Sequence, residues 1–195
     1  MALTRLGTNA ITSVPSSAIT ALPAGVGGKV LQVQQNTFTT KFTQTINGNT
    51  PATLNNGSSD IGVSITPSSA SNKILVSFNI GRITAHNSGA GWGLAFGIQR
   101  NGSLISQAIN TDGGNTPSYT WFAGTEEIVY DTEGTSFQFL DSPASTSQQT
   151  YTLKTISHSS SNYIVTINGW HSTPTGTNQG YQAGTITMVQ AMEIA

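Results

Sequence analysis

Short runs of alternating apolar and polar residues constrain the fold of this chain more than any other feature. In the run 73–83, Ile74, Val76 and Phe78 fall on one face, and the run 92–100 has the same pattern. A period of two residues is that of a β-strand with one buried face, because successive side chains point to opposite sides of the sheet. No segment of useful length has the 3.6-residue period of a helix, so we predict an all-β chain.

About ten strands of this kind are predicted, separated by turn residues. Besides the two runs above, they are 30–35, 38–46, 60–66, 103–109, 128–130, 137–140, 149–156, 163–168 and 185–194. Asn101-Gly102 is typical of a two-residue hairpin turn, and Asn168-Gly169 is predicted to form a second tight turn. Loops rich in Gly, Asn, Thr and Ser are predicted at 47–58, 84–91, 110–120 and 171–184. Many short strands without intervening helices favour an antiparallel β-sandwich or jelly roll.

Charged residues are scarce, at 8% of the chain against about 25% in typical domains. The polar surface is built instead from residues such as the 29 Thr and 23 Ser, which suit strands and turns. Sheet edges are often protected by Lys, and a surface poor in charge has weak protection against association. We therefore expect the chain to bury its edges against other copies or within a larger assembly.

The composition also argues against several classes of function. The net charge is −1 and the 7 Lys and Arg residues are scattered, so we expect no nucleic-acid interface. No apolar stretch is long enough to span a membrane, and the first residues lack the apolar core of a signal peptide. We therefore expect synthesis in a cytoplasm and no membrane insertion. Cys is absent, which excludes disulfides and thiolate metal sites.

Residues 1–27 differ from the rest of the chain. Short apolar pieces are separated there by Pro15, Pro23 and several Gly and Ser residues. Such a segment cannot form a core alone, so we interpret it as an extended arm that becomes ordered on a partner, in preference to a frayed terminus. The residues predicted to dock are Leu3, Leu6, Ile11, Val14, Ile19 and Leu22. Residues 28–195 are then one head domain.

Three groups of segments in the head occur in an order that resembles a known family. They are Gly28–Val33 (GKVLQV); Val63–Ser69 (VSITPSS) running into Asn72–Val76 (NKILV); and Phe139–Pro143 (FLDSP) with Thr150–Lys154 (TYTLK) and Met192–Ile194 (MEI). This order resembles small β domains in tail-fibre-like and other virion proteins of bacteriophages, especially those of cyanobacteria and other aquatic bacteria. The likeness covers about residues 28–195, although residues 84–134 match nothing in the family and the long repetitive shaft of a full fibre is missing. It implies a sandwich or jelly-roll head that forms a homotrimer, and the opening MALTRLGTNAIT resembles a particle-attachment segment.

The chain contains residue types that can serve catalysis, but their arrangement in the sequence does not indicate a catalytic site. Five of the eight acids lie close together, and paired carboxylates can hydrolyse glycosides, but we interpret them as a solvated connection between strands. They are Glu126, Glu127, Asp131, Glu133 and Asp141. His86, His158 and His171 are far apart in sequence, the Gly-rich stretch 89–97 leads into a strand, and no nucleophile elbow is present. We predict no catalytic, metal or cofactor site.

Aromatic residues are the best candidates for contact with a ligand. An aromatic face can stack on a sugar, although Trp and Tyr are also common in cores and subunit interfaces. Trp170-His171 and Tyr181 border the largest C-terminal loop. The residues predicted to contact a glycan are Trp121, Trp170, His171 and Tyr181.

These features together predict a non-enzymatic structural protein exposed at the surface of a virion. In the preferred interpretation it is a tail-fibre-like receptor-binding subunit, held by its arm to other virion proteins and presenting its head to host surface glycans for host attachment. In the alternative interpretation it is a capsid decoration or cement protein that stabilises the head shell. Copy number per particle separates the two, since a tail protein is present in tens and a capsid protein in hundreds.

Overall fold

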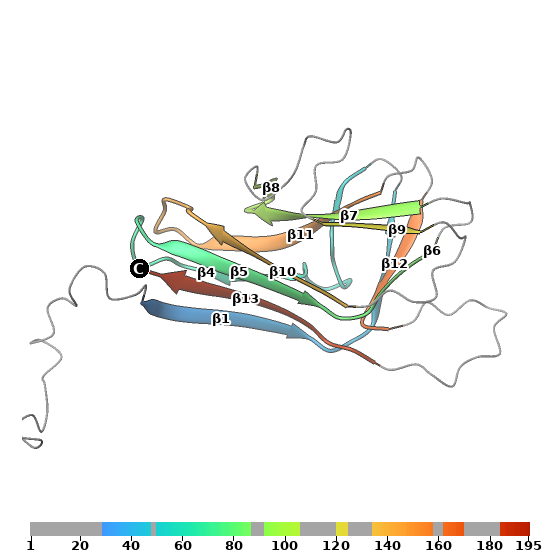
Figure 1. Cartoon of the computed structure of the whole chain (residues 1–195), viewed down its shortest axis with the longest axis horizontal. Coiled ribbons are helices and arrows are strands. Elements are labelled where there is room, and N and C mark those ends of the chain that lie inside the picture. The colour runs from blue at the N-terminus through green and yellow to red at the C-terminus, as the bar shows by residue number, and fades with distance from the viewer. Residues whose placement is uncertain are drawn as a thin grey trace, which may run out of the picture.

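The computed structural model of the chain describes residues 29–47, 50–86, 92–105, 120–124, 134–157, 162–169 and 184–195. These residues form strands and no helix, and therefore no helix able to cross a membrane (Figure 1). The strands are β1 Val30–Phe38, β2 Phe42–Ile46, β3 Ala52–Thr53, β4 Gly62–Ile65, β5 Lys73–Ile80, β6 Ile83–His86, β7 Trp92–Arg100, β8 Ser103–Leu104, β9 Thr120–Gly124, β10 Thr135–Asp141, β11 Gln149–Ser157, β12 Tyr163–Ile167 and β13 Thr187–Ile194. The all-β prediction is confirmed.

The strands form three antiparallel sheets. The four-stranded sheet has the order β1-β13-β5-β10. In the six-stranded sheet, β3 and β4 pair with one side of β11, β7 pairs with its other side, and β8 and β9 pair with β7. The three-stranded sheet has the order β2-β12-β6. This architecture confirms the predicted antiparallel sandwich of jelly-roll type.

The core lies between the four-stranded and the six-stranded sheets. Figure 1 shows β1 and β13 on one side of the molecule and β7 and β11 on the other. Alternation along each strand sends one set of side chains inward, as in β13, where buried and half-buried residues alternate throughout. Phe78 of β5 stacks on Phe137 of β10 with ring centroids 5.4 Å apart. The largest fully buried side chains are those of Tyr151, Phe78, Phe96, Ile46, Leu54, Ile61, Ile65, Ile74, Ile83 and Ile98.

The three-stranded sheet continues the four-stranded sheet across a bend. β1 leads into β2, and β5 leads into β6 after Gly81. Asn168, which follows β12, holds this bend together. Its backbone is left-handed, with a φ of 63°. Its amide Nδ2 donates to the carbonyl oxygens of Phe38 at 2.7 Å and Thr40 at 3.3 Å, and its Oδ1 accepts from the Thr187 hydroxyl at 2.8 Å. One buried amide therefore joins the strands on both sides of the bend.

Gly81 is required at the same bend. A Cβ at this position would lie 2.5 Å from Oδ1 of Asn168 and 2.6 Å from Oγ1 of Thr185. The Gly81 N–H donates to the Thr187 hydroxyl at 3.0 Å, and the Arg82 N–H donates to the Thr185 hydroxyl at 2.7 Å. The alternating run predicted as one strand over 73–83 is thus broken at Gly81, because the sheet turns there.

Most predicted strands agree with the structure, and the bounds of β7 are those expected. The Asn101-Gly102 hairpin is confirmed, with φ values of 51° and 83° that L-residues other than Asn rarely adopt. The tight-turn prediction at Asn168-Gly169 is not matched by a hairpin among the described residues, since β12 pairs with β2 and β6. The expected strand 128–130 lies outside the described residues.

Three short strands were not predicted. β3, β6 and β9 fall in or beside the segments 47–58, 84–91 and 110–120. Two to five residues are too few to establish a period of two, and these strands form because a longer neighbour offers them a free edge. The expected strand 38–46 is also divided, since Phe38 ends β1 and β2 begins at Phe42.

Candidate functional site

Most residues proposed for recognition lie outside the described part of the chain. This applies to the arm residues Leu3, Leu6, Ile11, Val14, Ile19 and Leu22, and to Trp170, His171 and Tyr181. Trp121 belongs to β9, where its backbone lies opposite Ala95 of β7. The structure therefore neither brings these aromatic residues together nor separates them.

Two of the three acids in the described residues are buried inside the fold. Of the five clustered acids only Asp141 is described, and it is buried in the core. Asp60 is exposed and accepts a hydrogen bond from the Asn55 amide at 2.9 Å. The third acid, Glu193, is fully buried. Within the described ranges, no group of three His, Cys, Asp or Glu residues is placed to hold a metal ion.

Glu193 accepts hydrogen bonds from three residues in two separate parts of the chain. Its Oε1 accepts from the Ser68 backbone N–H at 2.6 Å, the Ser68 hydroxyl at 2.7 Å and the Asn72 amide at 2.6 Å. Its Oε2 accepts from the Gln32 amide at 2.6 Å, and the same amide nitrogen donates to the carbonyl oxygen of Thr66 at 2.6 Å. We call Glu193 with Gln32, Ser68 and Asn72 the glutamate clamp. It ties β13, β1 and the β4–β5 connection together.

The donors of the glutamate clamp stabilise the charged carboxylate. Burial alone would raise the pKa of Glu193, because a charge is poorly solvated inside a protein. The hydrogen bonds from Asn72, Gln32 and Ser68 outweigh burial and lower its pKa from 4.5 to about 2. All of these donors are neutral groups. The clamp is therefore a fixed anion at neutral pH with its acceptors already occupied, which fits a structural role better than proton transfer.

A second buried carboxylate links the two sheets of the sandwich. Asp141 ends β10, and its two oxygens accept from Nη1 of Arg100 at 2.9 and 2.7 Å. Its Oδ2 also accepts from the hydroxyl of Tyr151 at 2.7 Å. Burial raises the pKa of Tyr151 far above its ordinary value, and the hydrogen bond to Asp141 adds to this, so the phenol is a neutral donor. We call Asp141, Arg100 and Tyr151 the aspartate clamp.

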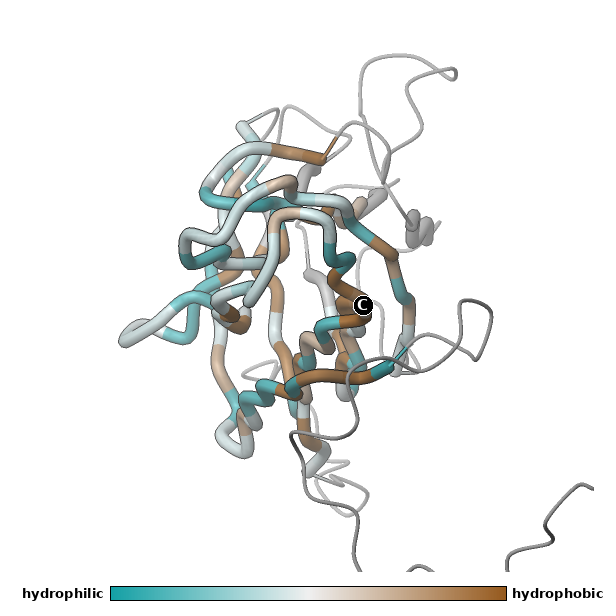
Figure 2. The backbone as a smooth tube through the Cα atoms, turned by 90° about the vertical axis from the view of Figure 1, so that its left-hand side faces the viewer, coloured by the Kyte–Doolittle hydropathy of each residue, from teal (hydrophilic) through white to brown (hydrophobic). Residues whose placement is uncertain are grey.

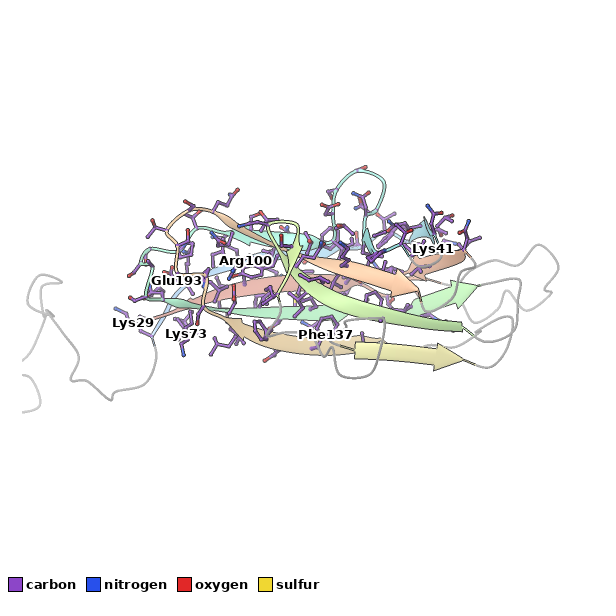
Figure 3. All side chains as sticks on the ribbon, turned by 90° about the horizontal axis from the view of Figure 1, so that it is seen from above. Lys29, Lys41, Lys73, Arg100, Phe137 and Glu193 are labelled. Carbon is purple, nitrogen blue, oxygen red and sulfur yellow. The ribbon has the colours of Figure 1, made fainter. Side chains whose placement is uncertain are left out.

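The two clamps explain the motifs singled out in the sequence. Gln32, Ser68, Asn72 and Glu193 come from the GKVLQV, VSITPSS, NKILV and MEI segments, and Asp141 and Tyr151 come from FLDSP and TYTLK. The sequence alone gave no sign that these distant segments converge. Figure 3 shows Glu193 at the end of the molecule that also carries Lys29 and Lys73.

Side-chain amides of β1 also close one edge of the sandwich. Asn36 donates to the carbonyl oxygen of Gly62 in β4 at 2.8 Å, and Gln32 donates to that of Thr66, just beyond β4. These bonds satisfy carbonyl groups at the free edge of the six-stranded sheet. The outer edge of β1 itself pairs with no other strand among the described residues, and the strand is exposed along most of its length.

Comparisons with known proteins give weak likenesses only. No protein-family model matches the chain, and no curated protein matches it. Among solved structures, the VP2 subviral particle of infectious bursal disease virus is 14% identical with a TM-score of 0.30, over 85% of this chain and 42% of that chain. The structure of the Gx strain of the same virus is 12% identical with a TM-score of 0.29, over the same shares. The chain thus spans less than half the length of these viral proteins.

Proposed function

We propose that the chain is a non-enzymatic structural protein of a bacteriophage virion, a tail-fibre-like subunit whose arm attaches it to the particle. The observation that carries this proposal is that the buried carboxylates of the described residues are bonded to partners within the fold. Glu193, Asp141 and Arg100 are occupied by partners within the fold, and Tyr151 is a buried neutral donor. Such groups hold strands together, as expected of a subunit whose task is mechanical.

The virion assignment rests on the segments that resemble the phage family, which coincide with the two clamps. In this proposal residues 1–27 dock on another virion protein, and the head forms a homotrimer at the virion surface. The aromatic residues Trp121, Trp170, His171 and Tyr181 are the proposed contacts for a host surface glycan. The alternative role, decoration of the capsid, uses the same fold and the same arm.

The direct test is the amount of this chain in purified particles of the virus that encodes it, measured by quantitative mass spectrometry. Tens of copies per particle support the tail assignment, and hundreds support capsid decoration. Absence from purified particles refutes a virion role of either kind.

Glycan recognition and the arm are tested separately. The Trp170→Ala variant is expected to lose binding on an array of bacterial surface glycans while keeping the circular dichroism spectrum of the wild type. Unchanged binding by this variant would remove Trp170 from the proposed contact. A variant that lacks residues 1–27 is expected to fold but to stay out of particles, and normal incorporation would refute the docking role.

A further inference from the structure

An apolar row crosses the whole outer face of the four-stranded sheet. Val33 of β1 lies opposite Met192 of β13, Met192 lies opposite Leu75 of β5, and Leu75 lies opposite Leu140 of β10. Residues directly opposite one another in an antiparallel sheet lie on the same face and in contact distance. Four apolar side chains therefore form one continuous row from edge to edge, which we call the outer row.

The outer row faces away from the core. In β13 the buried residues are Thr187, Val189, Ala191 and Glu193, so Met192 between the last two points to the other side of the sheet. The two ends of the row are the most open, since Val33 is 48% and Leu140 is 45% exposed. Leu75 and Met192, in the middle of the row, are half-buried.

Further apolar groups extend the outer row towards the end of the molecule that carries both Lys29 and the C-terminus. Val30 lies opposite Ile194 and is 52% exposed, and Leu31 beside it is 40% exposed. Figure 2 looks at this end and shows hydrophobic colour at the C-terminus. Of the five large hydrophobic residues that are exposed in the described part of the chain, four lie on β1 and β10. The register places three of these, Val30, Val33 and Leu140, on the outer face, and such a concentration of exposed apolar groups is typical of a contact surface.

The outer face is almost free of charge. The next row across the sheet is Gln35, Gln190, Ser77 and Gln138, all of them neutral. Lys73, opposite Ile194, stands at the rim. A surface shared by identical subunits must avoid placing like charges together, and a neutral face with an apolar row meets that condition. A charged partner would find only Lys73, at the rim, to recognise among these rows.

We infer that the outer row is the contact surface between copies of this chain. The inference deepens the proposed function and rests on it, since it assigns the face through which the proposed homotrimer forms. Three outer faces turned towards a three-fold axis would bury Val33, Met192, Leu75 and Leu140 together. The middle strands β13 and β5 would then lie nearest the axis, and the β1 edge of one copy would meet the β10 edge of the next, which withdraws the uncharged edge of β1 from solvent.

The experiment compares three forms of the full chain by sedimentation velocity and light scattering. The first is the wild type, expected at about three times the 20.3 kDa mass of one chain. The second is the double variant Val33→Lys, Leu140→Lys, expected to sediment as a monomer. The third is a matched control, Thr45→Lys with Ser58→Lys, which adds the same charge at exposed positions outside the row and is expected to stay oligomeric.

A second variant protects the test against simple misfolding. Val33→Thr with Leu140→Gln adds no charge and keeps strand-compatible residues at exposed positions, so its circular dichroism spectrum should match that of the wild type. Its oligomer should be weaker, so that it dissociates at a higher protein concentration than the wild-type oligomer does. If both row variants form the same oligomer as the wild type, the assigned face is refuted but the homotrimer is not. A monomeric wild type would overturn the face and the homotrimer together, while the virion role is decided independently by the content of purified particles.

Discussion

Replacing Glu193 by Gln tests the central energetic claim about the glutamate clamp. The carboxylate accepts four hydrogen bonds, three on Oε1 and one on Oε2. A glutamine can keep the three on its carbonyl oxygen, but its NH2 group then faces the amide nitrogen of Gln32. If Gln32 turns its amide over, its oxygen faces the carbonyl oxygen of Thr66. One unfavourable contact remains in either arrangement.

The size of the effect follows from the pKa of Glu193. A fall from 4.5 to about 2 corresponds to about 3 kcal/mol of stabilisation of the charged form in the folded state. The clamp lies near one end of the molecule, where solvent screens part of this energy, so we expect a loss of about 2–3 kcal/mol for Glu193→Gln at pH 7. Because the pKa is lowered on folding, the contribution is complete above about pH 4.5 and is lost as the pH falls towards 2.

The assay is urea unfolding at fixed protein concentration, followed by circular dichroism at pH 7, 5, 4, 3 and 2.5. The free energy of unfolding of the wild type should fall more steeply than that of Glu193→Gln below pH 4.5, and the two curves should converge at low pH. Asp60→Asn, at an exposed carboxylate, is the control and should change stability by less than about 0.5 kcal/mol at pH 7. Parallel curves for wild type and Glu193→Gln would show that the clamp does not hold a stabilised carboxylate.

Three further substitutions test the packing of the fold by the same unfolding assay. Asn168→Gly keeps the left-handed backbone but removes the amide, and we expect a loss of about 2–4 kcal/mol; a change under about 0.5 kcal/mol would mean that the bend does not depend on this side chain. Tyr151→Phe removes one donor to Asp141 and should cost about 1–2 kcal/mol, and wild-type stability would contradict the role given to the aspartate clamp. The buried hydroxyl of Thr155 has no hydrogen-bond partner within the described structure, so Thr155→Val should raise stability by about 1 kcal/mol, and a loss would indicate that the hydroxyl is satisfied.

Much of the fold could be predicted because its information is local. The alternation in 92–100 reports directly on which side chains face the core, and Asn101-Gly102 specifies its turn through the backbone conformations that these two residues tolerate. The short strands β3, β6 and β9 could not be predicted, since their pairing depends on the free edges of longer strands. The two clamps could not be predicted either, because they join residues that are distant in sequence. Sequence reasoning interpreted Asp141 as part of a solvated connection, although it is buried, and it had no means of placing Gln32, Ser68 and Asn72 around Glu193.

The sequence by itself determined that this chain is an antiparallel β protein with few charges. These properties follow from residue type and a period of two, and both can be counted along the chain. Only the tertiary structure decided which charged side chains are bonded inside the fold and which apolar side chains remain exposed. Val33, Met192, Leu75 and Leu140 are far apart in sequence and become one row through the register of three strand pairs. Register is set by the packing of the whole sheet, because a slip of one residue would turn every side chain of a strand to the opposite face.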